Sequence, residues 1–141
     1  MDKFLPDTNI VQAKDFSFEQ LYKPLYFSAV VLTELMTACN STKELRQYQK
    51  GWKDALNDGI LIVPTTEDWF DASRIQFLLA QERKKDAGGF SAKRTAKVKQ
   101  ELALDCLIAV SCARENITVI TNDNDFREIK RYLKKLKLLK F

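Results

Sequence analysis

Short apolar runs alternate with amphipathic stretches along the chain of 141 residues, and this alternation restricts the possible folds more than any other feature. The apolar runs have the length of buried strands, whereas the stretches between them carry apolar residues at helical spacing. Strands that alternate with helices usually pair in parallel, with the helices packed on both faces of the sheet. The sequence therefore predicts a single α/β domain over residues 1–141, a three-layer α/β/α sandwich around a short, mostly parallel central sheet.

Flanking turn residues set the expected limits of these elements. The predicted strands are Phe4–Leu5, Tyr26–Phe27, Ile60–Val63, Ile117–Ile120 and Leu136–Phe141. The predicted helices are Ser28–Cys39, Ser41–Asp58, Glu67 to about Arg83, about Ala92 to Glu115, and one that begins at Phe126. Ser28, Ser41 and Thr66 are the expected N-caps, because hydroxyl side chains accept hydrogen bonds from the free N–H groups of a first helical turn.

The composition excludes several classes of function. The chain has no histidine, so Ser-His-Asp and Cys-His nucleophile systems and histidine-ligated zinc or iron are ruled out. The longest stretch without a charge, Pro24 to Thr33, is ten residues, too short to cross a bilayer. Three cysteines among apolar neighbours do not make a disulfide framework. We therefore expect a cytoplasmic protein without membrane contact.

Four acidic residues occupy positions where a charge is unexpected. Asp7 and Asp123 each follow an apolar strand, and Glu34 and Asp105 are each the single charge in a long apolar helical segment. An ionised carboxylate among apolar side chains costs free energy unless it is paired or bound to a metal. The carboxyl ends of parallel strands meet at one edge of a sheet, so Asp7 and Asp123 are expected side by side there. Glu34 and Asp105 can reach the same edge from their helices.

Mutual repulsion among these four carboxylates favours a bound metal ion. The sequence places no buried arginine or lysine beside them, so each would raise the pKa of the others. A divalent cation removes the repulsion, and all-oxygen ligands suit Mg²⁺ or Mn²⁺. Taken singly, Asp7 and Asp123 could merely cap turns, and Glu34 and Asp105 could face solvent at a helix edge. Taken together, they favour a metal site.

The same acids lie in four segments that resemble, in order, the motifs of PIN domains. Leu5–Ile10 resembles the opening strand and its Asp-Thr-Asn turn, and Ser28–Leu35 resembles the second motif with its glutamate. Leu104–Ala109 is similar to the helix that carries the third acid. Val119–Phe126 resembles the closing segment. The resemblance covers nearly the whole chain, and among small PIN proteins it is greatest to the VapC-type ribonuclease toxins of bacterial toxin–antitoxin pairs.

The resemblance implies a metal-dependent endoribonuclease that uses Mg²⁺ or Mn²⁺ to hydrolyse phosphodiester bonds in RNA. By motif position, Asp7 and Asp105 would be the chief metal ligands and Asp123 a further one, with Glu34 completing the catalytic acids. Four neighbours would support them: Thr8, Asn9, Thr121 and Asp125. Thr121 would hold the local hydrogen-bond network, whereas Asp125 could instead only cap the last helix. Such toxins usually dimerise and are inhibited by a small antitoxin, so a homodimer and an antitoxin partner are implied as well.

Basic residues flank the acidic centre on both sides in the sequence. Seven basic against two acidic side chains lie between Glu82 and Lys99, and seven against one between Arg127 and Phe141. A basic rim can hold the phosphate backbone of RNA. We favour the first run for RNA contact, because a predicted loop at 88–90 adds a phenylalanine able to stack on a base. The candidate RNA-binding residues are Lys84, Lys85, Lys93, Arg94 and Lys97.

The alternatives are weaker but remain open at this stage. Lysine-rich helix faces are commonly just solvated. The C-terminal run is the poorer RNA candidate, because its leucines are expected to be buried: Leu133, Leu136, Leu138 and Leu139. A PIN-like domain could be a non-catalytic RNA- or protein-binding module, or an RNA-processing nuclease outside a toxin–antitoxin pair. A nucleotide-binding switch is disfavoured, because no glycine-rich phosphate loop follows a strand.

Overall fold

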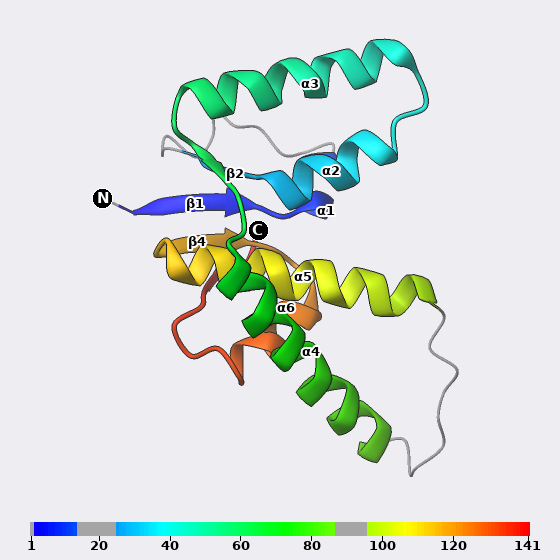
Figure 1. The fold of residues 1–141 in the computed structure, drawn as a ribbon, viewed down its shortest axis with the longest axis vertical. Coiled ribbons are helices and arrows are strands. Elements are labelled where there is room, and N and C mark those ends of the chain that lie inside the picture. Colours follow the sequence, from blue (N-terminus) through cyan, green and yellow to red (C-terminus); the bar gives the residue numbers. More distant parts are fainter. Residues whose placement is uncertain (1, 14–24, 87–95) are drawn as a thin grey trace.

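The part of the chain that the computed structural model describes contains five parallel-paired strands separated by one or two helices each, six helices in all (Figure 1). That part is residues 2–13, 25–86 and 96–141, with the backbone alone described at 86 and 96–98. The strands are β1 (Lys3–Pro6), β2 (Phe27–Ser28), β3 (Leu61–Ile62), β4 (Ile117–Ile120) and β5 (Lys137–Leu139). The helices are α1 (Thr8–Gln12), α2 (Ala29–Thr37), α3 (Thr42–Asn57), α4 (Thr66–Asp86), α5 (Ala96–Arg114) and α6 (Asn124–Lys130). The predicted α/β class is confirmed.

The strands form two hydrogen-bonded groups that meet at β1. One group has the order β1-β4-β5, and β2 pairs with β3 in the other, all in parallel. A parallel bridge between Phe4 and Leu25 connects the groups, and the Tyr26 N–H donates to the Phe4 carbonyl at 2.7 Å. In Figure 1, α2 and α3 lie on one side of β1 and β4, and α4, α5 and α6 lie on the other. The helices thus flank the sheet, as expected.

The register of β1 and β4 determines what lies at their carboxyl edge. Pro6 pairs with Ile120, the last residues of the two strands. The Asp7 N–H continues the ladder by donating to the Ile120 carbonyl at 3.1 Å. Because parallel strands end at the same edge, Asp7 and Thr121 leave the sheet side by side.

Helix α5 supplies a large share of the core. Its segment Cys106–Ala109 is at most 1% exposed and packs with Leu5 of β1 and Val119 of β4 in one buried cluster. This burial explains why the segment around Asp105 is so apolar. Among the described helices, none is both long and apolar enough to cross a membrane.

Burial of the C-terminal leucines differs from the prediction. Leu136 is fully buried, but Leu133 and Leu138 are only half-buried and Leu139 is 40% exposed. For Leu138 and Leu139 the reason is the place of β5 at the edge of its sheet, where it pairs with β4 alone and turns alternate side chains away from the core, whereas Leu133 lies before the strand. The prediction that all four are buried is therefore wrong.

Hydroxyl caps fix where the helices begin. Ser28 caps α2 by accepting from the Val30 N–H at 3.1 Å, and Ser41 caps α3 by accepting from the Glu44 N–H at 3.2 Å. Helix α3 ends at Asn57 with Asp58 as its C-cap, close to the predicted end, and the following Gly59 has a φ of 72°, the left-handed conformation that glycine tolerates best. The cap of α4 was wrongly predicted, because Thr65 rather than Thr66 makes the capping contacts.

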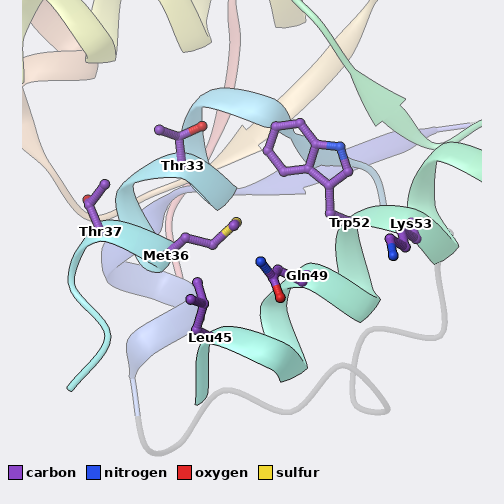
Figure 2. A pocket seen from close by; sticks show the side chains of 7 residues that line it. All are labelled: Thr33, Met36, Thr37, Leu45, Gln49, Trp52 and Lys53. Atoms are coloured by element: carbon purple, nitrogen blue, oxygen red, sulfur yellow. The ribbon is translucent and has the colours of Figure 1, made fainter. Parts of the chain in front are cut away.

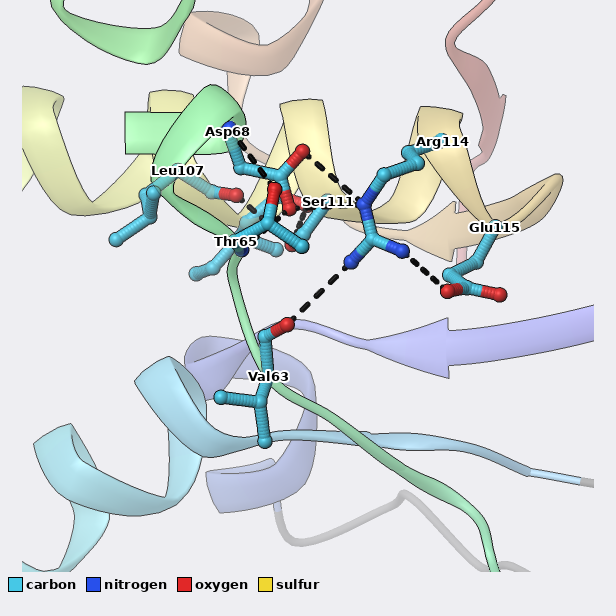
Figure 3. A network of polar contacts seen from close by, with 8 residues as sticks. Val63, Thr65, Asp68, Leu107, Ser111, Arg114 and Glu115 are labelled. Carbon is cyan, nitrogen blue, oxygen red and sulfur yellow. Dashed lines mark hydrogen bonds and ion pairs between the residues drawn. The ribbon is translucent and has the colours of Figure 1, made fainter. Parts of the chain in front are cut away.

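A buried carboxylate ties the start of α4 to the end of α5 (Figure 3). Asp68, 2% exposed, accepts from the Thr65 N–H at 2.9 Å, and Thr65 Oγ1 accepts from the Asp68 N–H at 3.1 Å. Arg114 of α5 donates from Nε to both Asp68 oxygens at 3.1 and 2.9 Å. It also donates to the Val63 carbonyl at 3.3 Å. This network anchors α5, the helix that carries Asp105.

Candidate metal centre

A small cleft of about 160 Å³ opens at the carboxyl edge of β1 and β4. Residues from β1–α1, α2, α5 and the β4–α6 turn line it: Asp7, Thr8, Asn9, Glu34, Glu101, Asp105 and Asp123. Five of these seven side chains are carboxylic acids. Within residues 2–13, 25–86 and 96–141, no arginine or lysine lines the cleft. The four acids singled out in the sequence therefore converge; what they do there stays a prediction.

Two of the acids cap the helices that follow their strands. Asp7 is the N-cap of α1 and accepts from the Ile10 N–H at 3.0 Å, and Asp123 is the N-cap of α6 and accepts from the Asp125 N–H at 2.9 Å. Aspartate is favoured at such strand-to-helix turns because its oxygen satisfies a free N–H group. Capping and a place in the cleft are thus compatible, since each carboxylate keeps further lone pairs.

Thr121 links these two turns. Its hydroxyl donates to Asp7 Oδ2 at 2.5 Å and accepts from the Asp123 N–H at 3.0 Å. The residue is 6% exposed, so the bonds form in a site largely screened from water. This is the hydrogen-bond network that was expected of Thr121, and it fixes the separation of the Asp7 and Asp123 turns.

The other acids come from helices. Glu34 projects from α2, and Asp105 and Glu101 lie one turn apart on α5. Glu101 was not singled out in the sequence. The signal was its four-residue spacing from Asp105, which puts both on one helix face. It was easy to miss, because it follows lysines and a glutamine and so does not interrupt an apolar run.

Burial and mutual repulsion raise the pKa of three of these acids. The pKa of Asp105 rises to about 8, first through burial and then through the charges of Asp123 and Glu34. Burial also raises the pKa of Asp7, although hydrogen bonds from Thr121 and Ile10 oppose the shift. These acids are strained electrostatically when all are ionised.

The Glu34 carboxyl is also poorly satisfied. Burial is the main cause of its raised pKa, the nearby Thr8 hydroxyl opposes the shift, and the Asp7 and Glu101 charges add to it. Glu34 Oε1 and Thr8 Oγ1 are nevertheless buried without a hydrogen bond of regular geometry. An orphaned carboxylate oxygen of this kind calls for a further donor or a cation.

The donor set fits a hard divalent cation. Asp105, Asp123 and Asp125 each present one carboxylate oxygen, and the three oxygens lie within 4.8 Å of one another. Asp7 and Glu34 line the same cleft as Asp105 and Asp123 and can add further carboxylate oxygens. Oxygen-only ligands of this kind suit Mg²⁺ or Mn²⁺, and a cation would relieve the repulsion described above.

One basic residue contacts Asp125, which lies outside the four acids singled out in the sequence. Arg83, near the end of α4, donates from one terminal nitrogen to Asp125 Oδ1 at 2.7 Å and to Glu128 Oε2 at 2.6 Å. The contact was not predicted, because Arg83 and Asp125 are 42 residues apart in sequence and meet only where α4 packs against α6.

The predicted RNA-binding residues are only partly described. Lys84 and Lys85 are exposed in the last turn of α4. Lys93 and Arg94 lie outside the described residues, as do positions 88–90. Lys97 lies on α5, where the backbone alone is described. Contact of these residues with RNA stays a prediction.

A larger hollow of about 610 Å³ lies between α2 and α3 (Figure 2). It is lined by Thr33, Met36, Thr37, Leu45, Gln49, Trp52 and Lys53. No carboxylic acid is among these residues, so the hollow has none of the ligands that a divalent cation requires.

Comparison with known protein families identifies the family of this chain. Residues 5–132 match the family model of the PIN domain. The chain therefore belongs to the PIN domain family. No curated protein sequence gives a significant match.

Solved structures support the fold over the full length. A chain in DNA-bound VapBC from Salmonella typhimurium has a TM-score of 0.57 at 18% identity, covering 99% of this chain and 98% of that one. A chain in VapBC2 from Rickettsia felis, bound to a promoter DNA fragment, has a TM-score of 0.55 at 19% identity. The match covers 99% of this chain and 98% of that one. A chain in VapBC-5 from Mycobacterium tuberculosis, a member of the VapBC family of toxin-antitoxin systems, has a TM-score of 0.54 at 18% identity. The match covers all of both chains. At these identities the likeness concerns the fold.

Proposed function

We propose that this PIN domain is a Mg²⁺- or Mn²⁺-dependent endoribonuclease and the toxin of a toxin–antitoxin pair. The observation that carries the proposal is the convergence of five carboxylic acids on one cleft that no described arginine or lysine lines. Such a cleft favours a cation over a neutral or anionic ligand. Membership of the PIN domain family supports the same interpretation, since these proteins are typically metal-dependent nucleases.

The proposed roles follow from the contacts of each acid. Asp7, Asp105 and Asp123 would hold the cation, which when bound supplies Lewis acidity and lowers the pKa of a coordinated water. Thr121 orients the Asp7 and Asp123 turns. Glu34 Oε1, which is buried and without a regular hydrogen bond, is proposed to take up a proton when water attacks phosphorus. No histidine is needed for this chemistry, in agreement with the composition.

The proposed substrate is RNA bound along a basic rim beside the acidic cleft. Lys84 and Lys85 at the end of α4 are exposed and able to contact phosphates, and Lys93, Arg94 and Lys97 are proposed to extend the same rim. The rim would hold the backbone while the cation offsets the negative charge at the cleft.

An antitoxin partner and a cytoplasmic location are proposed together. The solved neighbours named above come from VapBC complexes, which pair a toxin with an antitoxin. We propose that this chain likewise binds a small antitoxin protein. A non-catalytic PIN module, or an RNA-processing nuclease outside such a pair, is the alternative.

Replacement of Asp7 by asparagine tests the nuclease itself. The change keeps the shape of the side chain but removes its charge, so Mn²⁺-dependent cleavage of an RNA panel is expected to fall at least ~100-fold. Asp54→Asn on the exposed face of α3 is the matched control and is expected to cleave as the unchanged protein does. If Asp7→Asn retains the same activity as the control, the site does not act through Asp7 and the proposed nuclease is rejected.

We propose that the homodimer forms through the outer face of α4. Trp69, Phe70 and Phe77 are 56, 73 and 61% exposed there, which is a large apolar surface for one helix. Two copies of α4 packed against each other through this face would bury the aromatic rings.

The molar mass in solution tests this interface. We expect size-exclusion chromatography with light scattering to give a molar mass of twice the 16.3 kDa of one chain. Phe77→Glu should halve that mass, because a charge in the apolar face opposes burial. Leu56→Glu, an exposed site on α3, should remain dimeric. A Phe77→Glu protein that stays at the dimer mass would exclude this face.

A further inference from the structure

Arg83 is the one described basic side chain that contacts the acids around the proposed site. Besides its bonds to Asp125 and Glu128 from the terminal nitrogen, its Nε donates to Glu128 Oε2 at 3.1 Å. Its side chain is 26% exposed, so the ion pairs are partly screened from water. The Arg83 guanidinium therefore holds a positive charge in direct contact with the Asp125 carboxylate.

The contact matters because Asp125 belongs to the acidic cluster. Its carboxylate oxygen lies within 4.8 Å of oxygens of Asp105 and Asp123, close enough for the three to share a cation. Counting Asp7, Glu34 and Glu101 as well, the neighbourhood holds enough acids for two divalent ions. Enzymes with two metal ions hold them roughly 3.5–4 Å apart, with carboxylates to offset both charges. A guanidinium on Asp125 competes with a second ion for that acid.

We propose that Arg83 is a built-in counter-cation that withholds Asp125 from metal binding and limits the site to one divalent ion. The inference rests on the proposed function, since it concerns the same site. It assigns Asp105 and Asp123 to the ion together with Asp7, and it assigns Asp125 to Arg83. Arg83 thus supplies, next to the Asp125 carboxylate, a positive charge that a second cation would otherwise bring.

A purely structural role for Arg83 is the competing explanation. The neighbouring Glu82 also contacts the end of α6 and the residues after it, through Arg131 and the Tyr132 hydroxyl. These contacts hold α6 against α4 without Arg83. Variants at Arg83 are therefore expected to fold, and a change in ion binding would report on charge rather than on the packing of α6.

Calorimetric titration with Mn²⁺ alone tests the proposal without an activity assay. The unchanged protein is expected to bind one ion. Asp125→Asn should bind one ion with an affinity within about threefold of that of the unchanged protein, because Asp125 is already paired with Arg83. Arg83→Gln should bind a second ion or bind the first about tenfold more tightly, since a positive charge beside the site is lost. An Asp125→Asn protein that loses affinity more than tenfold, or an Arg83→Gln protein that titrates like the unchanged one, would overturn the proposal.

Two further variants separate this inference from the proposed function. Arg131→Gln removes an arginine on the Glu82 side of α6 and should titrate as the unchanged protein, so a matching gain in ion binding there would refute a specific role for Arg83. Asp105→Asn should lose the ion altogether. If Asp105→Asn binds Mn²⁺ normally, the proposed site fails; if it loses binding while Arg83→Gln titrates normally, only the counter-cation role fails.

Discussion

Replacement of Asp105 by asparagine is expected to remove Mn²⁺ binding, to lower RNA cleavage at least ~100-fold, and to leave the metal-free protein at least as stable as before. Loss of a ligand explains the first two effects. The third follows from the pKa of about 8, because burial and the charges of Asp123 and Glu34 make the ionised form unfavourable in the folded state. Asparagine cannot ionise and so avoids that cost.

The titration described above checks the loss of ion binding, the RNA cleavage assay checks the loss of activity, and thermal unfolding in EDTA checks the stability of the metal-free protein. The melting temperature of Asp105→Asn should equal or exceed that of the unchanged protein. Mn²⁺ should raise the melting temperature of the unchanged protein but not that of Asp105→Asn. Asp54→Asn, exposed on α3, should behave as the unchanged protein in every assay. A metal-free melting temperature more than ~5 °C lower for Asp105→Asn would mean that its carboxylate is structural, paired with a cation.

The stability of the metal-free protein is expected to fall as the pH rises from about 5 to about 8. Asp105 keeps its proton in the folded chain up to about pH 8, whereas in the unfolded chain it ionises near pH 3.8, the ordinary pKa of an aspartate side chain. Between these values the folded state binds more protons than the unfolded state, so the free energy of unfolding decreases with rising pH. Above pH 8 both states are ionised and the contribution levels off. The loss is on the order of 1 to 3 kcal/mol.

Melting temperatures in EDTA across that pH range measure this effect. The unchanged protein should lose roughly 5 °C or more, and Asp105→Asn should lose distinctly less. With saturating Mn²⁺ the trend should reverse, because the ion replaces the proton and binds better as the pH rises. A metal-free melting temperature that rises from pH 5 to pH 8, or an identical slope in both proteins, would show that Asp105 is not the titrating group.

Features that depend on local sequence were predictable. The apolar runs at Ile117–Ile120 and around Leu5 indicated the two strands that form the site edge, since buried parallel strands are short and apolar. Asp7 and Asp123 follow these strands directly, so the predicted strand ends were enough to place both acids at the carboxyl edge of the sheet. Glu34 and Asp105 stood out as lone charges in buried helices. Chain order and local pattern were therefore enough to bring four acids to one cleft.

Features that depend on packing between distant elements were not predictable. Arg83 reaches Asp125 only because α4 crosses near α6, and nothing in the neighbouring sequence marks that contact. Glu101 was hidden among charged neighbours. The α4 cap depends on Arg114 as well as on Thr65, since the arginine fixes the Asp68 carboxylate from the end of α5. Such residues are identified by geometry rather than by pattern.

A crystal grown or soaked with Mn²⁺ and measured at an X-ray energy where manganese scatters anomalously tests the central claim most directly. The account predicts one anomalous peak in the cleft, within coordination distance of Asp7, Asp105 and Asp123, while Asp125 stays with Arg83. A cleft that holds no peak at saturating Mn²⁺, with the ion absent or bound elsewhere on the surface, would contradict it.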